Sequence, residues 1–302
     1  MTGRTMPRTA PARLPRSLIP VTRRVSGLLH GDYSGLLHRA GSELGDTRRY
    51  LEGDDVRRID WPATARTNET QVHDTIADHE LDVWMVVDAS ASMAFGTARS
   101  TKYRLAADVA AAIGYLICQS GNRLGCVVTG SSGRITPRSG IDHLAVVLAA
   151  IERAGSTGTT EVKADAATAL AMLLSPRTRG GLVVVISDFL DGGWASQMGR
   201  LSQRHDVIAI SVADPREFSL PNVGVIDMQD AETGRVMAVD TARTEVRTAF
   251  AKHAVLAHDA RIAALRSSRV DVLDLRTDSD WPALLAGFLR TRKRRLAAGA
   301  RR

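Results

Sequence analysis

One aspartate and two serines alternate in the segment Asp88-Ala-Ser90-Ala-Ser92, which follows an apolar run over residues 83–87. The run is continuous rather than alternating, as is typical of a buried strand in a parallel sheet. In an open α/β sheet, the loops at the carboxyl ends of the strands converge on a ligand crevice. A carboxylate and two hydroxyls in such a loop can all face one hard cation, and Mg²⁺ accepts oxygen ligands of this kind. Asp88, Ser90 and Ser92 are therefore the first candidates for metal ligands.

Two later segments match this one in chemistry. The segment Gly155-Ser-Thr-Gly-Thr-Thr-Glu161 combines hydroxyls with glycine just before a helical pattern, and residues 181–188 form a second apolar run that ends in Asp188. Taken singly, each piece also fits a helix N-cap or a turn that terminates a strand. Taken together and in this order, the three segments resemble the metal-ion-dependent adhesion site of von Willebrand factor A domains.

This resemblance implies a site for Mg²⁺ or Mn²⁺ whose candidate ligands are Asp88, Ser90, Ser92, Thr159, Thr160 and Asp188. The first three would ligate directly, the second aspartate through water, and one of the two threonines on rearrangement. Such a site supplies few carboxylates, so the cation retains an exchangeable water that a Glu or Asp of a partner protein can replace. Glu161 could also approach the cation and change its charge balance.

A second resemblance lies upstream. Residues 41–61 contain an Arg-x-Tyr pattern at 48–50, Gly-Asp-Asp at 53–55 and Arg-x-Ile-Asp-Trp, ending at Trp61. They resemble the signature of a bacterial family named only as domain of unknown function 58, over roughly residues 25–290. Genes of that family typically accompany a MoxR-type AAA+ ATPase, which implies a chaperone or assembly role rather than catalysis. Within the signature we expect Trp61 to anchor the segment to the core, while Arg57 or Arg58 contacting a partner is the alternative.

The charge is unevenly distributed. Formal net charge is +7, from 40 basic and 33 acidic residues. Residues 1–31 hold six arginines and residues 290–302 hold seven basic residues, neither with an acid, so 27 basic and 33 acidic residues remain between them. A mildly acidic middle suits a cation site and disfavours a duplex-binding face on the fold itself. The two ends are either simply solvated or make salt-sensitive contacts with nucleic acid or anionic lipid.

We expect a cytoplasmic protein. The longest apolar stretch, residues 105–118, is interrupted by Asp108 and falls short of the roughly 17 residues of a minimal transmembrane span. The N-terminus has arginines but no apolar segment of the kind that marks a secretory signal. Cys118 and Cys126 fit small buried hydrophobic side chains better than a redox or metal pair.

From residue 81 onward, apolar strands alternate with helical patterns. This predicts an α/β fold: a mostly parallel, doubly wound sheet of the von Willebrand factor A-like, Rossmann type, with an irregular or β extension at the N-terminus. We expect strands at 81–88, 124–129, 182–188, 206–212 and 270–275, and a hairpin of 223–230 with 235–240. Helices are expected at 102–119, 141–153, 163–174, 194–204, 242–267 and from about 280.

Four parts of the chain follow from this pattern. They are a disordered basic tail (1–24), the family-signature segment packed on the main domain (25–79), the A-like domain (80–290) and a basic C-terminal tail (291–302). Some of the last part could continue a helix.

Catalysis has weaker support than binding. The chain contains no G-x-S-x-G, H-E-x-x-H or Walker A motif, and no histidine stands beside the Asp-x-Ser-x-Ser segment. We therefore expect a non-enzymatic, metal-dependent adaptor or co-chaperone that works with a MoxR-type AAA+ ATPase in the assembly or maturation of other proteins. The alternative is a tail-driven nucleic-acid or membrane-surface adaptor without a working metal site, and a metal-dependent hydrolase is the third hypothesis.

Overall fold

The computed structural model describes residues 47–51, 56, 59–67, 69–73, 80–130, 133–156, 166–175, 178, 180–229 and 234–299. The predicted N-terminal tail lies outside these residues, as does most of the first half of the family-signature segment.

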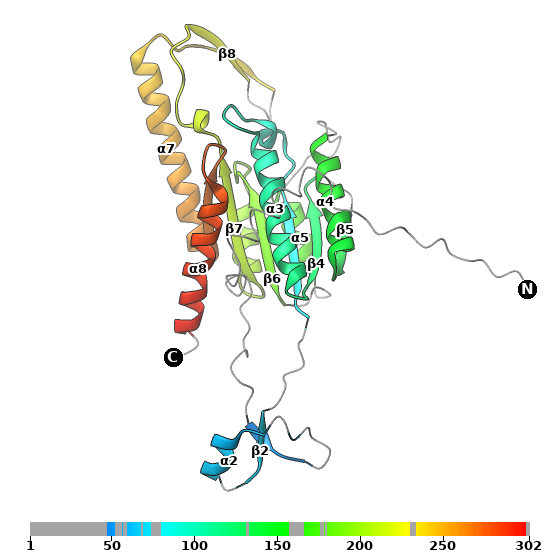
Figure 1. Cartoon of the computed structure of the whole chain (residues 1–302). Coiled ribbons are helices and arrows are strands. Elements are labelled where there is room, and N and C mark those ends of the chain that lie inside the picture. The colour runs from blue at the N-terminus through cyan, green and yellow to red at the C-terminus, as the bar shows by residue number, and fades with distance from the viewer. Residues whose placement is uncertain are drawn as a thin grey trace, which may run out of the picture.

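A six-stranded sheet, ordered β10-β7-β6-β3-β4-β5, forms the centre of the main domain (Figure 1). The parallel strands are β3 (Asp82–Val87), β4 (Arg123–Val128), β6 (Leu182–Ser187), β7 (Asp206–Ala213) and β10 (Asp271–Arg276). The predicted mostly parallel sheet is thus confirmed. The edge strand β5 (Arg134–Arg138) runs antiparallel to β4 and was not predicted. Its Pro137 argues against a central strand but is tolerated at an edge, where one N–H needs no partner.

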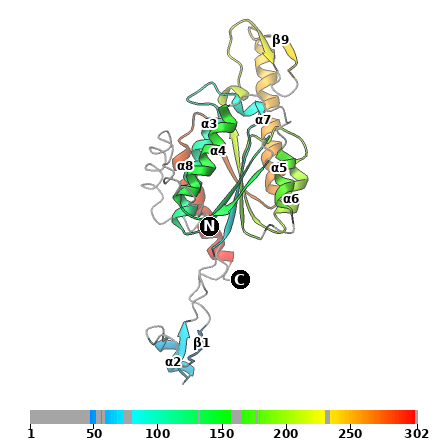
Figure 2. The same ribbon diagram turned by 90° about the vertical axis from the view of Figure 1, so that its right-hand side faces the viewer.

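Helices cover both faces of the sheet (Figure 2). One face carries α3 (Lys102–Gln119), α4 (Ile141–Ser156) and α8 (Trp281–Gly299), and the other α5 (Ala166–Leu173), α6 (Trp194–Leu201) and α7 (Thr244–Ser267). The side chains of β3 alternate between two apolar cores, because successive residues of a strand point to opposite faces. Val83 and Met85 pack with the first group of helices, and Trp84 and Val86 with the second.

Shorter elements complete the main domain. Two 3₁₀ turns, η3 (Ala91–Ala94) and η4 (Pro215–Glu217), follow β3 and β7. The predicted hairpin is confirmed as β8 (Val225–Gln229) paired antiparallel with β9 (Val236–Asp240). None of the helices in the described part of the chain is long and apolar enough to cross a membrane. Cys126 is buried and Cys118 partly buried, as expected, and burial raises the pKa of the Cys126 thiol to about 12.

The family-signature segment forms a small unit of its own, composed of β1 (Thr47–Arg49), α2 (Trp61–Thr67) and β2 (Gln71–His73), with β1 antiparallel to β2. Asp60 caps α2 by accepting a hydrogen bond from the backbone N–H of Ala63 at 2.9 Å. Ala63 and Val72 are buried, but Trp61 is 68% exposed. Within this unit the Trp61 side chain, at the first helical position, points to solvent. Its expected role as an anchor to the core stays a prediction, because it depends on how the unit packs on the main domain.

Figure 1 draws this unit away from the main domain. Residues 74–79, which join the two, are outside the described part of the chain. The predicted packing of the unit on the main domain stays a prediction.

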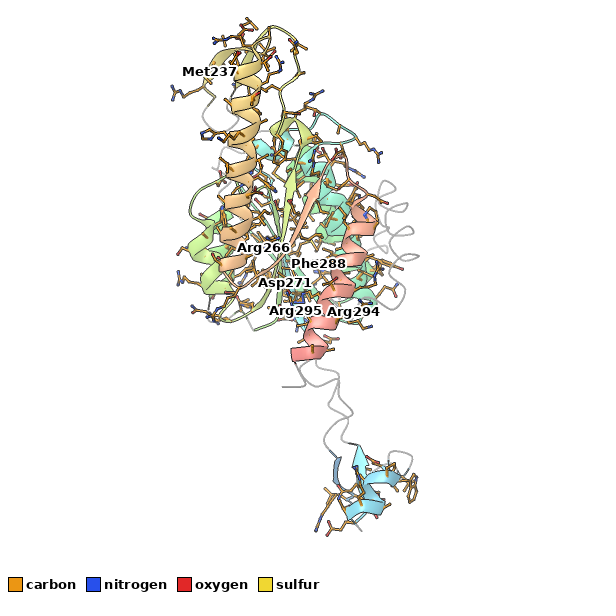
Figure 3. The ribbon with its side chains drawn as sticks, turned by 90° about the vertical axis from the view of Figure 1, so that its left-hand side faces the viewer. Met237, Arg266, Asp271, Phe288, Arg294 and Arg295 are labelled. Atoms are coloured by element: carbon orange, nitrogen blue, oxygen red, sulfur yellow. The ribbon has the colours of Figure 1, made fainter. Side chains whose placement is uncertain are left out.

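The basic run after Arg290 is helical, which corrects the expected tail boundary. α8 continues to Gly299, and the buried Arg292 lies within it. Its guanidinium forms ion pairs with Asp206 at the start of β7 and with Asp271 at the start of β10, the latter with Nε at 2.8 Å. Arg295 adds a second contact to Asp271 (Figure 3). Carboxylates at the starts of β7 and β10 thus hold in place a segment that, from its composition alone, is expected to be solvated.

Arg292→Ala should lower the free energy of unfolding by on the order of 3 kcal/mol. It leaves the Asp206 carboxylate without its cation and leaves Asp271 only its contact with the exposed Arg295. Arg294→Ala is the matched control: Arg294 is an exposed arginine on the same helix, and its loss should cost less than about 0.5 kcal/mol. Urea unfolding at pH 7 measures both. Equal effects of the two substitutions would contradict the assigned role of Arg292.

Candidate metal centre

Asp88 is a buried carboxylate at the point where β3 ends. Its Oδ1 accepts hydrogen bonds from the backbone N–H of Ser90 at 2.9 Å and from Oγ1 of Thr129 at 3.0 Å. Its Oδ2 accepts from Oγ of Ser187 at 2.5 Å. Thr129 follows β4 and Ser187 ends β6, so one side chain connects the carboxyl ends of three adjacent strands.

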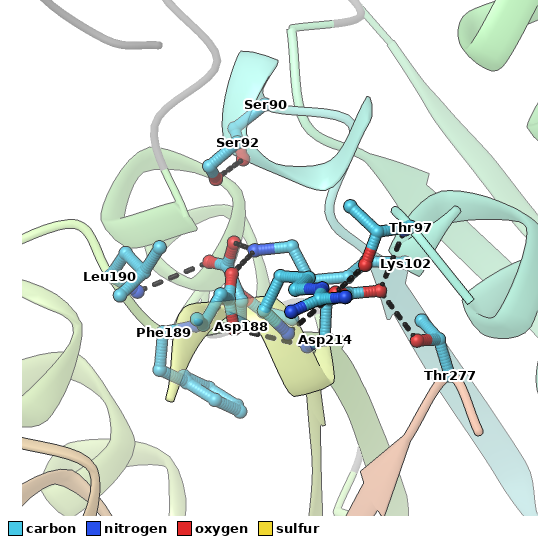
Figure 4. A network of polar contacts seen from close by, with 12 residues as sticks. Ser90, Ser92, Thr97, Lys102, Asp188, Phe189, Leu190, Asp214 and Thr277 are labelled. Carbon is cyan, nitrogen blue, oxygen red and sulfur yellow. Dashed lines mark hydrogen bonds and ion pairs between the residues drawn. The ribbon is translucent and has the colours of Figure 1, made fainter. Parts of the chain in front are cut away.

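The two predicted serines lie together in the same loop. Their hydroxyl oxygens are 3.1 Å apart, and both residues are buried (Figure 4). Ser90 has an extended backbone immediately before η3, and Ser92 lies inside that turn, which brings the alternate side chains to one side. The loop thus gathers Asp88, Ser90 and Ser92 at the carboxyl edge of the sheet.

Asp188, the second strand-end aspartate, is paired with a buried lysine. Its Oδ2 lies 2.7 Å from Nζ of Lys102, and its Oδ1 accepts a hydrogen bond from the backbone N–H of Leu190 at 3.1 Å. The Lys102 ammonium also forms an ion pair with Glu217 of η4. Each oxygen of Asp188 therefore has one donor, with lone pairs left for a water molecule.

Lys102 and Glu217 are not among the site residues predicted from the sequence. The available signal was a lysine at the first position of a mostly apolar helix, the first helix of the main domain after the Asp-x-Ser-x-Ser loop. It could not name the partners of that lysine.

The backbone after Asp188 is strained. Phe189 has φ 54°, in the left-handed region that side chains other than glycine rarely adopt. Its N–H donates to Oγ of Ser187 at 2.9 Å, and its carbonyl accepts from Nε1 of Trp194 at 3.1 Å. The two rings also pack edge to face, 5.2 Å between centroids. These contacts hold the turn that directs Asp188 toward Lys102.

Asp214 at the end of β7 anchors the neighbouring loop. It accepts hydrogen bonds from the N–H and Oγ1 of Thr97, at 2.9 and 2.6 Å, and from Oγ1 of Thr277 at 2.6 Å. Its own N–H donates to Glu217 at 3.1 Å. The loop after β3, the turn after β7 and the end of β10 are thereby linked.

The charges at this edge are unequally compensated. Burial raises the pKa of the Asp88 carboxyl and the charge of Asp188 raises it further, against hydrogen bonds from Ser187 and Ser90 that lower it. Burial alone would lower the pKa of Lys102, but the charges of Asp188 and Glu217 outweigh it and the net direction is upward. Lys102 therefore stays charged and neutralises Asp188, whereas Asp88 has no such cation among the described residues.

These features fit a divalent cation bound by Asp88, Ser90 and Ser92, because it would supply the positive charge that the buried Asp88 lacks. Within the described ranges, no three His, Cys, Asp or Glu side chains form a cluster able to hold a metal ion. A site here therefore depends on hydroxyl ligands, which Mg²⁺ accepts. The predicted ligands Thr159 and Thr160 lie outside the described residues.

The fold and these residues define an α/β protein with polar loops gathered at the carboxyl edge of a mostly parallel sheet. A family model described as "Protein of unknown function DUF58" matches residues 46–261, and the chain belongs to this family. It is 42% identical over 287 residues to "Uncharacterized protein Rv1480" of Mycobacterium tuberculosis and to "Uncharacterized protein Mb1516" of Mycobacterium bovis. Each alignment covers 93% of this chain and 89% of the relative.

Two of the solved structures that the chain matches come from Bacteroides. The conserved hypothetical protein BatB from Bacteroides thetaiotaomicron has a TM-score of 0.44 at 17% identity, over 72% of this chain and 99% of that one. An aerotolerance-related membrane protein from Bacteroides fragilis has a TM-score of 0.42 at 14% identity, over 73% and 98%.

Lys102→Met should lower the free energy of unfolding by about 3–5 kcal/mol, because it leaves the buried Asp188 charge unpaired. Adding Asp188→Asn should recover part of this loss by removing that charge. The control is Arg104→Met, which breaks a partly exposed pair with Asp108 and should cost less than about 1 kcal/mol. Urea unfolding at pH 7 measures these changes in the free energy of unfolding. A decrease for Lys102→Met as small as that for the control would refute the buried ion pair.

The Asp214 network predicts a pH dependence. Burial by itself would raise the pKa of Asp214, but hydrogen bonds from Thr277, Thr97 and the N–H of Arg216 bring it down to about 2. A lowered pKa means that ionised Asp214 stabilises the fold fully above its unfolded value of about 3.9 and loses that effect as pH falls toward 2.

The stability gap between the parent and Asp214→Asn should therefore stay constant from about pH 7 to 5 and narrow below about pH 4. Urea unfolding across this range measures it. Asp227→Asn, at an exposed position in β8, serves as control and should leave the curve unchanged. A gap that is constant at every pH would show that Asp214 acts only through packing.

Proposed function

We propose that this chain is a divalent-metal-dependent protein-binding protein with a von Willebrand factor A-like domain, an adaptor or co-chaperone rather than an enzyme. The observation that carries the proposal is the position of Asp88, Ser90 and Ser92 in one buried loop at the carboxyl edge of the sheet, with the two hydroxyls 3.1 Å apart. One carboxylate and two neutral hydroxyls favour a weakly neutralised cation, which suits binding of an acidic residue.

The chain's own residues have distinct parts in this proposal. Asp88, Ser90 and Ser92 would hold Mg²⁺ or Mn²⁺, and hydrogen bonds from Thr129 and Ser187 orient the Asp88 carboxylate. When bound, the cation offers a positive centre with water positions open to exchange. A Glu or Asp of a partner can replace one of those waters.

The charge of Lys102 also supports a cation at Asp88 that can bind an acidic residue. Because its ammonium neutralises Asp188, Asp88 is the one uncompensated carboxylate of the pair. A second free carboxylate would reduce the positive charge presented to a partner. Because Lys102 neutralises Asp188, this second aspartate does not reduce the positive charge that the centre presents to acidic groups. Asp188 can still contact the cation through a water molecule.

For the partner we propose a MoxR-type AAA+ ATPase, on the ground of the family's typical gene neighbourhood. The complex would act in the assembly or maturation of other proteins. We propose the cytoplasm as its compartment, since Cys118 and Cys126 are free thiols of the kind that a reducing environment preserves.

Calorimetric titration of Mg²⁺ and Mn²⁺ into the chelator-treated protein tests the site. We expect binding by the parent, loss of binding in Asp88→Ala, and unchanged binding in Asp227→Ala, a control at an exposed position. Thermal melts with and without Mg²⁺ give a second readout: the metal should raise Tm in the parent and leave Asp88→Ala unaffected, because a ligand bound only to the native state stabilises it. Absence of metal binding by the parent would refute the proposal.

A pull-down with the cognate MoxR-type ATPase, with and without chelator, tests the partner. Capture should require the metal and Asp88, and it should survive deletion of residues 1–24. A deletion at the C-terminus should remove only residues 300–302, because α8 continues to Gly299 and contains the buried Arg292. Chelator-insensitive capture that is lost with residues 1–24 would favour the tail-driven adaptor instead.

A further inference from the structure

Helix α7 is much longer than the sheet that it covers. Its 24 residues span about 36 Å, whereas the six residues of β10 span about 20 Å. Only Ile262 and Leu265, near its C-terminal end, are buried. In Figure 3 the helix runs from Arg266 beside the sheet to a far end near Met237 of the hairpin. Residues 219–229 and 234–258 thus form an extension, which we call the arm.

The arm buries little apolar surface within itself. No residue of β8 or β9 is buried, and Val225, Val236 and Met237 are 68%, 61% and 66% exposed. A two-stranded hairpin is at best marginally stable alone, and a protein helix owes most of its stability to the packing of one apolar face. Both elements of the arm therefore leave large apolar side chains exposed among the described residues.

An open groove of about 700 Å³ runs along the arm helix, and its lining includes Leu220, Arg247, Ala251, Lys252, Val255 and Leu256. Val255 and Leu256 are 46% and 58% exposed. The helical lining positions 244, 248, 251 and 255 are spaced by three and four residues, which places them on one stripe of the helix. A stripe of this spacing beside a groove is the geometry that receives an amphipathic helix.

The charge of the groove indicates which side chains a helix bound there would carry. Its lining contains two cations and no acidic residue. Arg247 donates to the carbonyls of Thr241 and Ala242 and to Oγ1 of Thr244, and no described carboxylate pairs with it or with Lys252. Acidic side chains on the occupant would provide the missing partners.

We propose that the arm binds an amphipathic helix of a protein partner whose apolar stripe is flanked by acidic residues. The arm leaves the fold after β7, at the same carboxyl edge of the sheet as Asp88, so one partner could contact both the arm and the candidate metal centre. Two contacts on one partner strengthen each other through effective concentration. The inference rests on the proposed function only for that second contact, and the groove itself needs no metal.

Fluorescence anisotropy with a labelled synthetic helix tests the groove on the full chain. The probe carries Leu at its a and d positions and Glu at e and g, and a second peptide has Lys in place of Glu. We expect the Glu peptide to bind, the Lys peptide to fail, and the affinity to fall with rising salt. Lys252→Glu and the double variant Val255→Asp with Leu256→Asp should each weaken binding about tenfold or more.

Arg266→Glu is the matched control, a charge reversal at an exposed position on the same helix but outside the groove, and it should leave the affinity unchanged. The Glu peptide should also bind to Asp88→Ala and in the presence of chelator. Failure of the metal titration and failure of peptide binding can therefore be distinguished. Equal binding of the two peptides, or no effect of Lys252→Glu, would overturn the proposal.

Two measurements identify the other possible occupants. A parent protein that is dimeric by light scattering, and monomeric as Val255→Asp with Leu256→Asp, would assign the groove to a second copy of the chain. Flotation with anionic phosphatidylserine vesicles that the same double variant abolishes would assign it to lipid. Either result overturns the proposal of an acidic helix.

Discussion

The buried carboxylate of Asp88 connects three strand ends, and the carboxyl edge of the sheet depends on that connection. Thr129 after β4 and Ser187 of β6 both donate to it, while the N–H of Ser90 closes the loop after β3. Parallel pairing makes this possible because it brings the ends of these adjacent strands to the same edge. Burial raises the pKa of Asp88, and the same pairing places Asp188 near enough for its charge to raise that pKa further.

Lys102 divides the two aspartates into different roles. Its ammonium compensates Asp188 and reaches Glu217, and Glu217 in turn accepts from the backbone of Asp214. Asp214 accepts hydrogen bonds from Thr97 in the loop after β3 and from Thr277 after β10, so hydrogen bonds and ion pairs run along the edge from β6 to β10. Because Lys102 compensates Asp188, Asp88 is the carboxylate of this pair that has no cation beside it among the described residues. In the proposed function, this asymmetry would favour binding of acidic groups over tight capture of the metal alone.

The arm enlarges the surface that starts at this edge. Phe218, which follows Glu217, packs edge to face on His258 of α7 and lies under the guanidinium of Arg276. The base of the arm is therefore attached to the same polar edge that holds the candidate centre. Its outer part carries exposed apolar residues, together with Arg247 and Lys252, which pair with no carboxylate in the part of the chain that the structure describes. A partner can cover these features. A protein bound there and at the metal would contact two surfaces of different chemistry.

Local patterns in the sequence determined most of the fold. Continuous apolar runs and helical spacing predicted the parallel strands, the helices and the hairpin, and the Asp-x-Ser-x-Ser segment placed Asp88, Ser90 and Ser92 in one loop, because those residues are neighbours in the chain. Tertiary structure alone decided the contacts between distant residues. Lys102 meets Asp188 and Glu217 across 86 and 115 positions, and Arg292 meets Asp206 across 86. No local pattern predicts such pairs, because a charged residue taken by itself is expected to be solvated. Only the packing of distant segments excludes water from it and places an oppositely charged side chain beside it.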